Sequence, residues 1–282
     1  MIPAIDGIRR VAVVTGSNQG IGYFIALQLA MSGRFQDVVL ACRNESRAMQ
    51  AVASMQPKLT ADTNGACCVS YETLELGNST SHQQFVKRME ENFGKVDCLV
   101  NNAAMAFKTT DPTPHEEQCT PTLDINFRGT VDFTEKMLPL IRKGEDARIV
   151  NLSSSTARLD QVSPELQKRF SSDDLTMEDL RKMMDAYERD VKDGTYAEKG
   201  WSNTNYGMSK LAITAATRVL ARAEAGNGIT VNCCDPGYCK TSMTSQRGTF
   251  SPEQGARTAV MLALEQDLPD GEFFANEKVT KW

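Results

Sequence analysis

The sequence predicts an α/β fold: a doubly wound, mostly parallel sheet of seven strands in a single domain. Two observations lead to this class. Short apolar, β-branched segments alternate with amphipathic helical segments along nearly the whole chain. A glycine-rich turn, Gly16 to Gly22, joins the first such strand to the first such helix. No internal repeat or low-complexity linker divides the 282 residues, so one domain spanning 1–282 is expected.

Most of the predicted strands are short and rich in valine, isoleucine or leucine, as buried parallel strands are. The next element is usually a helix, and strands joined through helices run parallel. The predicted strands are residues 11–14, 38–40, 67–74, 98–100, 149–152, 229–232 and 271–275. The predicted helices are residues 20–32, 46–55, 79–93, 121–141, 205–224 and 252–265.

An insertion of about 156–204 interrupts this alternation and is too long for a simple connection. Ser163 followed by Pro164 indicates one helix start, and Thr176 followed by Asp179 indicates another. We interpret the insertion as a helical patch packed on the main sheet, and a lid over a substrate site is the alternative. The second helix carries an apolar stripe: Leu180, Met183, Met184, Tyr187 and Val191.

Charge and hydropathy exclude several kinds of partner. The formal net charge of −5 gives no basic surface for nucleic acid. No run of about 18 apolar residues is present, so no membrane span is expected. Residues 1–10 lack an apolar signal segment and the last four residues match no targeting signal, which predicts a cytoplasmic location.

The eight cysteines are expected to be small buried thiols rather than disulfides, because no secretory signal is evident. The chain has no C-x-x-C motif and only two histidines, His82 and His115. A metal site is therefore not expected.

The glycine-rich turn is a candidate phosphate site. Its glycines allow a tight turn and a close backbone approach to a pyrophosphate, and the following helix presents free N–H groups. The alternative is a purely structural turn. The candidate cofactor contacts are Gly16, Asn18, Gln19, Gly20, Ile21 and Gly22.

The end of the second strand favours NADPH over NADH. An NAD site usually places a carboxylate about 20 residues beyond the glycines, but Cys42 and Arg43 occupy that region here. The Arg43 guanidinium suits a 2′-phosphate, and Arg47 lies one helical turn further on. Arg47, taken alone, is equally well explained as a solvated surface charge. Asn18 is uncharged but could form a hydrogen bond with the 2′-phosphate.

Three later strand ends supply further candidate cofactor contacts, because ligands bind at the carboxyl edge of such a sheet. Glu75 follows the third strand and could accept from an adenine amino group. Asn102 and Ala103 follow the fourth strand, where small residues permit a close approach. The turn Pro236–Gly237 and Thr241 follow the sixth strand, with Thr241 expected on the nicotinamide side.

Tyr206 and Lys210 stand four residues apart on a predicted helix, so a phenol and an ammonium share one helix face. A nearby cation favours the phenolate and is expected to lower the Tyr206 pKa. Such a pair could exchange a proton at neutral pH. Without the other motifs, chance placement on one helix face would be the better explanation.

Taken together, these motifs resemble the short-chain dehydrogenase/reductase family over nearly the whole chain. The chain is most similar within it to monomeric NADPH-dependent carbonyl reductases, through Ala106–Lys108, Asp111–Pro114, Ser163–Gln167 and the long insertion. The matching family motifs are Thr15-Gly16-x-x-x-Gly20-Ile21-Gly22, Asn101-Asn102-Ala103, Asn126, Ser154, Tyr206-x-x-x-Lys210 and Pro236-Gly237.

The resemblance implies a Rossmann-type oxidoreductase with four catalytic residues. Tyr206 protonates the carbonyl oxygen, and Lys210 lowers the Tyr206 pKa and binds the nicotinamide ribose. Ser154, rather than its neighbour Ser153, donates to the developing alkoxide. Asn126 orders a water that links Lys210 to solvent.

The expected function is NADPH-dependent reduction of ketones, aldehydes or quinones by a monomeric enzyme. One alternative is a dedicated reductase or alcohol dehydrogenase for one hydrophobic metabolite, such as a steroid, prostanoid or pterin. A second is a non-catalytic NADP(H)-sensing protein. The candidate substrate contacts are Ser154, Tyr206 and Tyr238, although Tyr238 is equally well read as an aromatic packed on the insertion.

Overall fold

The structure is a computed structural model that describes residues 9–62 and 67–282. The prediction about a signal segment in residues 1–10 concerns mainly residues 1–8, which lie outside the described residues.

One mostly parallel sheet forms the centre of the domain, in the order β3-β2-β1-β4-β5-β6-β7-β8. The first seven strands are parallel, and β8 pairs antiparallel with β7. The fold class is as predicted, but eight strands are described instead of seven. The strand that the sequence did not indicate is a two-residue edge strand, too short for any hydrophobic pattern. The strands are β1 (Val11–Thr15), β2 (Asp37–Cys42), β3 (Cys68–Thr73), β4 (Cys98–Asn101), β5 (Ala147–Leu152), β6 (Ile229–Asp235), β7 (Phe273–Ala275) and β8 (Lys278–Val279).

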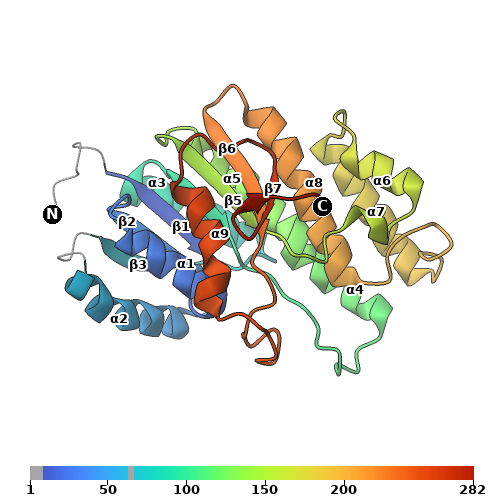
Figure 1. Ribbon diagram of the computed structural model, residues 1–282, viewed down its shortest axis with the longest axis horizontal. Coiled ribbons are helices and arrows are strands. Elements are labelled where there is room, and N and C mark those ends of the chain that lie inside the picture. The colour runs from blue at the N-terminus through green and yellow to red at the C-terminus, as the bar shows by residue number, and fades with distance from the viewer. Residues whose placement is uncertain (1–8, 63–66) are drawn as a thin grey trace.

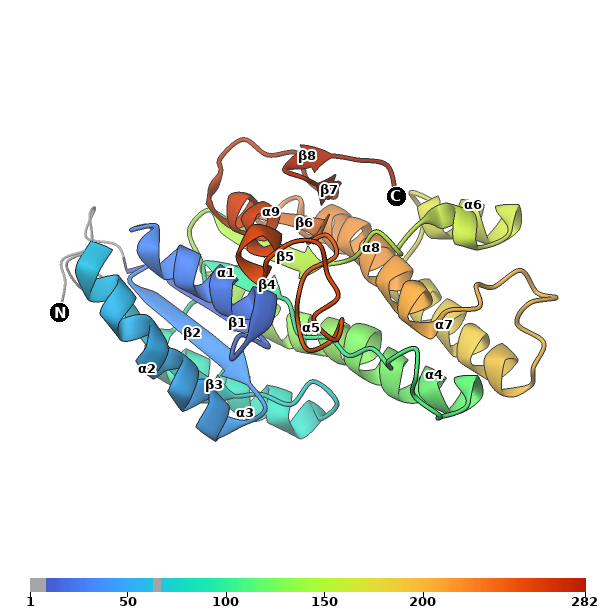
Figure 2. The same ribbon diagram turned by 60° about the horizontal axis from the view of Figure 1, so that its bottom comes forward.

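Helices cover both faces of this sheet (Figures 1 and 2). Residues of α1, α2 and α9 pack on one face, and residues of α3, α5 and α8 pack on the other. The strands β1, β2, β4 and β5 are buried on both sides, which explains their largely apolar sequences. The helices are α1 (Gly20–Met31), α2 (Glu45–Asp62), α3 (Ser79–Phe93), α4 (His115–Leu123), α5 (Thr130–Ile141), α6 (Pro164–Ser171), α7 (Met177–Lys192), α8 (Asn205–Glu224) and α9 (Pro252–Leu264).

The helix expected over 121–141 is more complex. It begins earlier, as α4, and continues through a π-helical segment, Asp124–Gly129, into α5. π-helical turns are rare and are frequent at functional sites. This one contains Asn126, whose buried side chain is therefore presented by a widened turn.

The insertion forms two helices, α6 and α7, that pack against α8, and α7 also packs against α4. Ser163 caps α6 and Thr176 caps α7, each accepting from a backbone N–H of its helix. The apolar stripe of α7 lies in one hydrophobic cluster with residues of α4 and α8. In Figure 1 both helices lie beside α8, at the end of the molecule away from β2 and β3.

The strand order fixes the place of a ligand site. From β1 the chain builds outward to β2 and β3, and then returns to place β4 on the other side of β1. The connections after β1 and β4 therefore diverge to opposite faces and leave a crevice at the carboxyl edge of the sheet. The glycine-rich turn and Asn102 both lie at this edge.

Candidate active site

Two cavities meet at Tyr206. The first has a volume of about 360 Å³ and the second about 340 Å³. Lys210 lines only the first cavity, Ser154 lines only the second, and Tyr206 lines both. The Tyr206 phenol thus stands where the contents of the two cavities would meet. The other residues shared by both walls are Ile21, Ser153, Pro236, Thr241 and Met243.

The glycine-rich turn forms one wall of the first cavity, at the N-terminus of α1. Gly16 and Gly20 have φ values of 63° and 60°, a region that favours glycine. At Gly22, an added Cβ would lie 2.4 Å from Asn102 Nδ2 and 2.7 Å from the Gly16 carbonyl oxygen. Asn102 is held there because its Nδ2 donates to the carbonyl oxygens of Thr15 and Gly16, at 2.9 and 3.2 Å. The lack of a side chain at Gly22 thus lets Asn102 pack closely against the start of α1, where Gly20, Ile21 and Gly22 line the cavity.

The two residues predicted to bind a 2′-phosphate, Arg43 and Arg47, lie in different places in the structure. Arg43 is exposed and lines the first cavity. Arg47 does not line it but borders an adjoining hollow together with Asn18 and Gln19, which line both spaces. The structure therefore brings Arg43, rather than Arg47, to the cavity wall.

Most of the remaining predicted cofactor residues line the first cavity: Glu75, Ala103, Pro236 and Thr241. Gly237 lines only the second cavity. Sequence reasoning did not identify several further lining residues, although they neighbour predicted ones at the same strand ends or in the π-helical segment. They are Leu74, Leu76, Gly77, Ala104, Met105, Ile125, Ser242 and Met243.

The first two turns of α8 position Tyr206 and Lys210. Thr204 caps this helix by accepting from the backbone N–H of Gly207. Lys210 is 4% exposed, and its Nζ donates to the Leu152 carbonyl oxygen at 2.6 Å. The same Nζ lies 5.7 Å from the centre of the Tyr206 ring. The ammonium and the phenol are therefore neighbours, as their spacing predicted.

Burial has the largest effect on the pKa values of Tyr206 and Lys210. Burial raises the pKa of Tyr206 to about 12, with Asp235 acting in the same direction and the hydrogen bond with Ser154 opposing it. Burial lowers the pKa of Lys210 to about 8. The pKa of Tyr206 therefore lies above its ordinary value and not below it, because desolvation of the phenolate outweighs the opposing hydrogen bond with Ser154.

The two neighbouring serines differ in their surroundings. The Ser154 hydroxyl opens to the second cavity, accepts from the backbone N–H and hydroxyl of Thr156, and is hydrogen-bonded to Tyr206. The Ser153 hydroxyl is buried and lies 2.7 Å from the Thr214 hydroxyl. Ser154 is thus the serine whose hydroxyl is directed toward the phenol.

Asn126 is occupied by protein partners. Its Oδ1 accepts from the Met105 N–H at 2.8 Å, and its Nδ2 donates to the Met105 carbonyl at 2.9 Å and to the Ser209 hydroxyl at 3.0 Å. The side chain thereby ties the segment after β4 to α8. The structure gives it no direct hydrogen bond to Lys210 among the described residues, so a water link remains a prediction.

Loops after β4 and β6 form most of the second cavity. Tyr238 lines it and is 52% exposed, so it faces the cavity instead of packing on the insertion. Of the insertion, only Thr156 reaches the wall, which does not favour a lid. Further lining residues that sequence reasoning missed are Ala106, Phe107, Lys108, Thr109, Thr110, Met243, Thr244, Ser245 and Arg247.

The described residues contain no group of three or more histidine, cysteine, aspartate or glutamate side chains that could hold a metal ion. Within the same part of the chain, no helix is long and apolar enough to cross a membrane. All the cysteines except Cys68 are buried, in agreement with the predicted small buried thiols.

Comparisons with known proteins agree with this geometry. Residues 10–164 match the short chain dehydrogenase family model, and residues 176–268 match the model described as enoyl-(acyl carrier protein) reductase. Carbonyl reductase (NADPH) 1 of Mus musculus is 38% identical, covering 97% of this chain and 99% of its own. The Homo sapiens protein of the same name is 36% identical, covering 96% of this chain and 98% of its own.

The solved structure of salutaridine reductase from Papaver somniferum has a TM-score of 0.83 at 30% identity, covering 95% of this chain and all of its own. Menthone neomenthol reductase from Mentha piperita has a TM-score of 0.79 at 28% identity, covering 95% and 98%.

Proposed function

The chain belongs to the short-chain dehydrogenase family, and we propose that it is an NADPH-dependent carbonyl reductase that converts ketones, aldehydes or quinones to alcohols. Two lines support this assignment. The relatives at 36–38% identity are named NADPH carbonyl reductases. The observation that carries the mechanism is the position of Tyr206 at the junction of two cavities, with Lys210 on one side and Ser154 on the other.

The residues of the first cavity fit the nicotinamide dinucleotide. The crowded glycine turn leaves room for a pyrophosphate against the start of α1, and Arg43 supplies a cation for a 2′-phosphate. Glu75 and Ala103 would contact the adenosine half of the cofactor, and Lys210 and Thr241 would contact the nicotinamide half. NADPH, when bound, supplies the hydride.

Tyr206 is the proton donor in this proposal. With a pKa of about 12, the phenol is protonated at neutral pH. An alkoxide is a stronger base than a phenolate, so the proton passes downhill from Tyr206 to the reduced carbonyl oxygen. The phenol is thus protonated at neutral pH and is still more acidic than the alcohol that forms.

Ser154 and Lys210 assist from opposite sides. The Ser154 hydroxyl donates to the oxygen on which negative charge develops. Lys210, with a pKa of about 8, is mostly charged at neutral pH and stabilises the phenolate that Tyr206 leaves behind. Asn126 keeps Met105 in the wall of the first cavity.

A dedicated reductase for one hydrophobic metabolite is the second candidate. The apolar side chains of Phe107, Tyr238 and Met243 in the second cavity favour a hydrophobic substrate. Two similar solved structures are named reductases of salutaridine and of menthone. A non-catalytic NADP(H) sensor would instead bind the cofactor without turnover.

Packing of the insertion on α4 and α8 supports a monomer, since it covers helix surface that could otherwise pair with a second copy. Size-exclusion chromatography tests this part of the proposal, and a stable tetramer would contradict it. A cytoplasmic location stays a prediction.

A panel of carbonyl substrates, assayed with NADPH and NADH side by side, tests the function. We expect turnover of aromatic aldehydes and quinones with NADPH and a large preference over NADH. Strong turnover of a single bulky ketone alone would favour the dedicated reductase. NADPH binding without turnover of any substrate would favour the sensor.

A further inference from the structure

Two hydrogen bonds join Thr156 to Ser154 in the wall of the second cavity. The backbone N–H of Thr156 donates to Ser154 Oγ at 3.2 Å, and the Thr156 hydroxyl donates to the same oxygen at 3.0 Å. One residue at the start of the insertion therefore supplies two donors to the hydroxyl that is proposed to stabilise the developing alkoxide.

These two bonds occupy the acceptor sites of Ser154. A hydroxyl group has one proton to donate and two lone pairs that accept. Because an N–H and an O–H are directed at the Ser154 oxygen, both lone pairs are used and only the proton is left for a further partner. Ser154 can then donate to a neighbouring group but cannot accept from one. The neighbour in the same cavity wall is Tyr206.

The direction of the hydrogen bond between Ser154 and Tyr206 matters for proton transfer. A phenol is a stronger acid than an aliphatic alcohol, so in an unconstrained pair the phenol would be the favoured donor. A Tyr206 proton bound to Ser154 would be directed away from the substrate. The occupied lone pairs of Ser154 exclude that arrangement. In agreement, the hydrogen bond with Ser154 acts to lower the pKa of Tyr206, as a bond donated to the phenol oxygen does.

The backbone of Thr156 is itself held against the start of α8. Its carbonyl oxygen accepts from Gln161 Nε2 at 2.7 Å, and the same nitrogen donates to the Arg158 carbonyl oxygen at 2.9 Å. An added Cβ on Gly207, the residue after Tyr206, would lie 3.3 Å from the Thr156 carbonyl oxygen and 2.6 Å from Gln161 Oε1. Thr156 therefore lies between Gln161 and the first turn of α8, which fixes the direction of its N–H group.

We propose that Thr156 is a positioning residue that directs the protons of Ser154 and Tyr206 toward the substrate carbonyl oxygen. It acts by occupying the acceptor sites of Ser154, so that Ser154 donates and cannot take the Tyr206 proton. This inference rests on the proposed function and deepens it. Both protons are then available as negative charge develops on the oxygen. An interaction that strengthens in the transition state raises kcat, so the effect of Thr156 is expected in kcat more than in the KM of the carbonyl substrate.

The test compares Thr156→Val with Thr156→Ser in steady-state assays of a quinone or aldehyde at saturating NADPH. Valine has nearly the shape of threonine but no hydroxyl, whereas serine keeps the hydroxyl. Thr156 is exposed, so both variants are expected to fold. We expect kcat of Thr156→Val to fall about fivefold, as for loss of one hydrogen bond, and kcat of Thr156→Ser to stay within about twofold of the wild type. The NADPH dissociation constant should stay unchanged in both.

A double-mutant cycle separates an action through Ser154 from a direct contact of Thr156 with the substrate. Ser154→Ala removes the oxygen that Thr156 binds. Adding Thr156→Val to Ser154→Ala should therefore lower kcat no further, because the two residues act as one unit. The same fivefold loss in both backgrounds would show that Thr156 acts independently of Ser154, and would overturn the inference.

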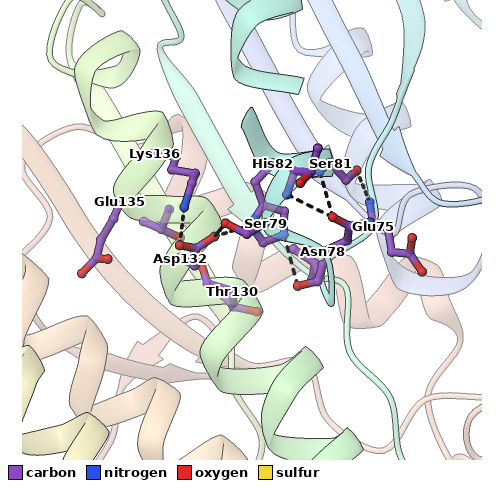
Figure 3. Close-up of polar contacts among 12 residues, drawn as sticks. Glu75, Asn78, Ser79, Ser81, His82, Thr130, Asp132, Glu135 and Lys136 are labelled. Atoms are coloured by element: carbon purple, nitrogen blue, oxygen red, sulfur yellow. Dashed lines mark hydrogen bonds and ion pairs between the residues drawn. The ribbon is translucent and has the colours of Figure 1, made fainter. Parts of the chain in front are cut away.

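Ser81→Ala is the matched control at the first cavity. The Ser81 hydroxyl also accepts from a backbone N–H, that of Glu75 at 3.0 Å, and Figure 3 shows these two residues side by side. This variant should change NADPH affinity at most a few-fold and leave kcat at saturating NADPH unchanged. Wild-type kcat in Thr156→Val, or an equal loss in Thr156→Ser, would overturn the inference. A wild type that reduces no carbonyl substrate would refute the proposed function, and the inference with it.

Discussion

The two cavities that meet at Tyr206 are built in different ways. The first is formed mainly by the ends of β1 to β5, the turns that follow them, and the start of α1. The second is formed mainly by the loop residues 106–110 and 235–247. Strand ends are fixed by sheet register, for example Val14 opposite Leu40 and Val100, whereas the loops have no such ladder. We infer that the first cavity determines the choice of cofactor and tolerates few substitutions. The second cavity determines the choice of substrate and tolerates more of them.

The largest effect on cofactor binding is expected at Gly22, the most crowded glycine in the wall of the first cavity. Gly22→Ala would place a methyl group against Asn102 and the Gly16 carbonyl oxygen, both at contact distances that require a shift. Overpacking of this kind costs about 1–3 kcal/mol, and we expect NADPH affinity to fall at least roughly tenfold. Calorimetric titration with NADPH measures it. Gly226→Ala is the control, because no atom lies within 4 Å of its added Cβ.

A loss of comparable size, in turnover, is expected from a substitution in the second cavity. Ser154→Ala removes a donor to the developing oxyanion, and one such donor is typically worth about 10²-fold in kcat. NADPH affinity should stay within about twofold of the wild type. Ser153→Ala, which removes a buried hydrogen bond to Thr214, should lower thermal stability more than turnover. The reverse order of the two serines in kcat would show that the second cavity has been assigned the wrong donor.

An intermediate effect is expected from replacing the arginine that is proposed to bind the 2′-phosphate. Arg43→Ala should weaken NADPH binding about tenfold, as expected for loss of a charge-assisted hydrogen bond. The affinity for NADH should stay nearly unchanged. Arg47→Ala should have a smaller effect, because Arg47 lies in the adjoining hollow. Steady-state KM values for both cofactors distinguish the two arginines. Equal losses for NADPH and NADH in Arg43→Ala would remove its proposed role.

The smallest effect is expected from the loop side of the second cavity. Tyr238→Ala should change KM for carbonyl substrates a few-fold, in a direction that depends on substrate size, since Tyr238 is half exposed. NADPH affinity should not change. Val279→Ala, at an equally exposed residue of β8, serves as the control. A uniform loss for every substrate would indicate a catalytic rather than a shaping role.

The same contrast explains what the sequence could predict. Tyr206 and Lys210 were identifiable because helical spacing alone puts them on one face, and the glycine turn was identifiable because it follows a buried strand. Lys108, Met243 and Arg247 were not, because loop paths depend on distant contacts such as the pairing of Cys239 with Phe250. The direction of the Tyr206 pKa shift was also missed, since its burial comes from segments distant in the chain. His82 had no sequence signal that separates a buried histidine from an exposed one.

The central claim is that Tyr206 transfers a proton at the boundary between a cofactor cavity and a substrate cavity. Tyr206→Phe tests it most directly, because it removes one hydroxyl and keeps the ring. The account predicts that kcat for a quinone or aldehyde falls by roughly 10²–10⁴-fold, while the NADPH dissociation constant stays within about twofold. Undiminished turnover, or loss of NADPH binding in a folded variant, would contradict it.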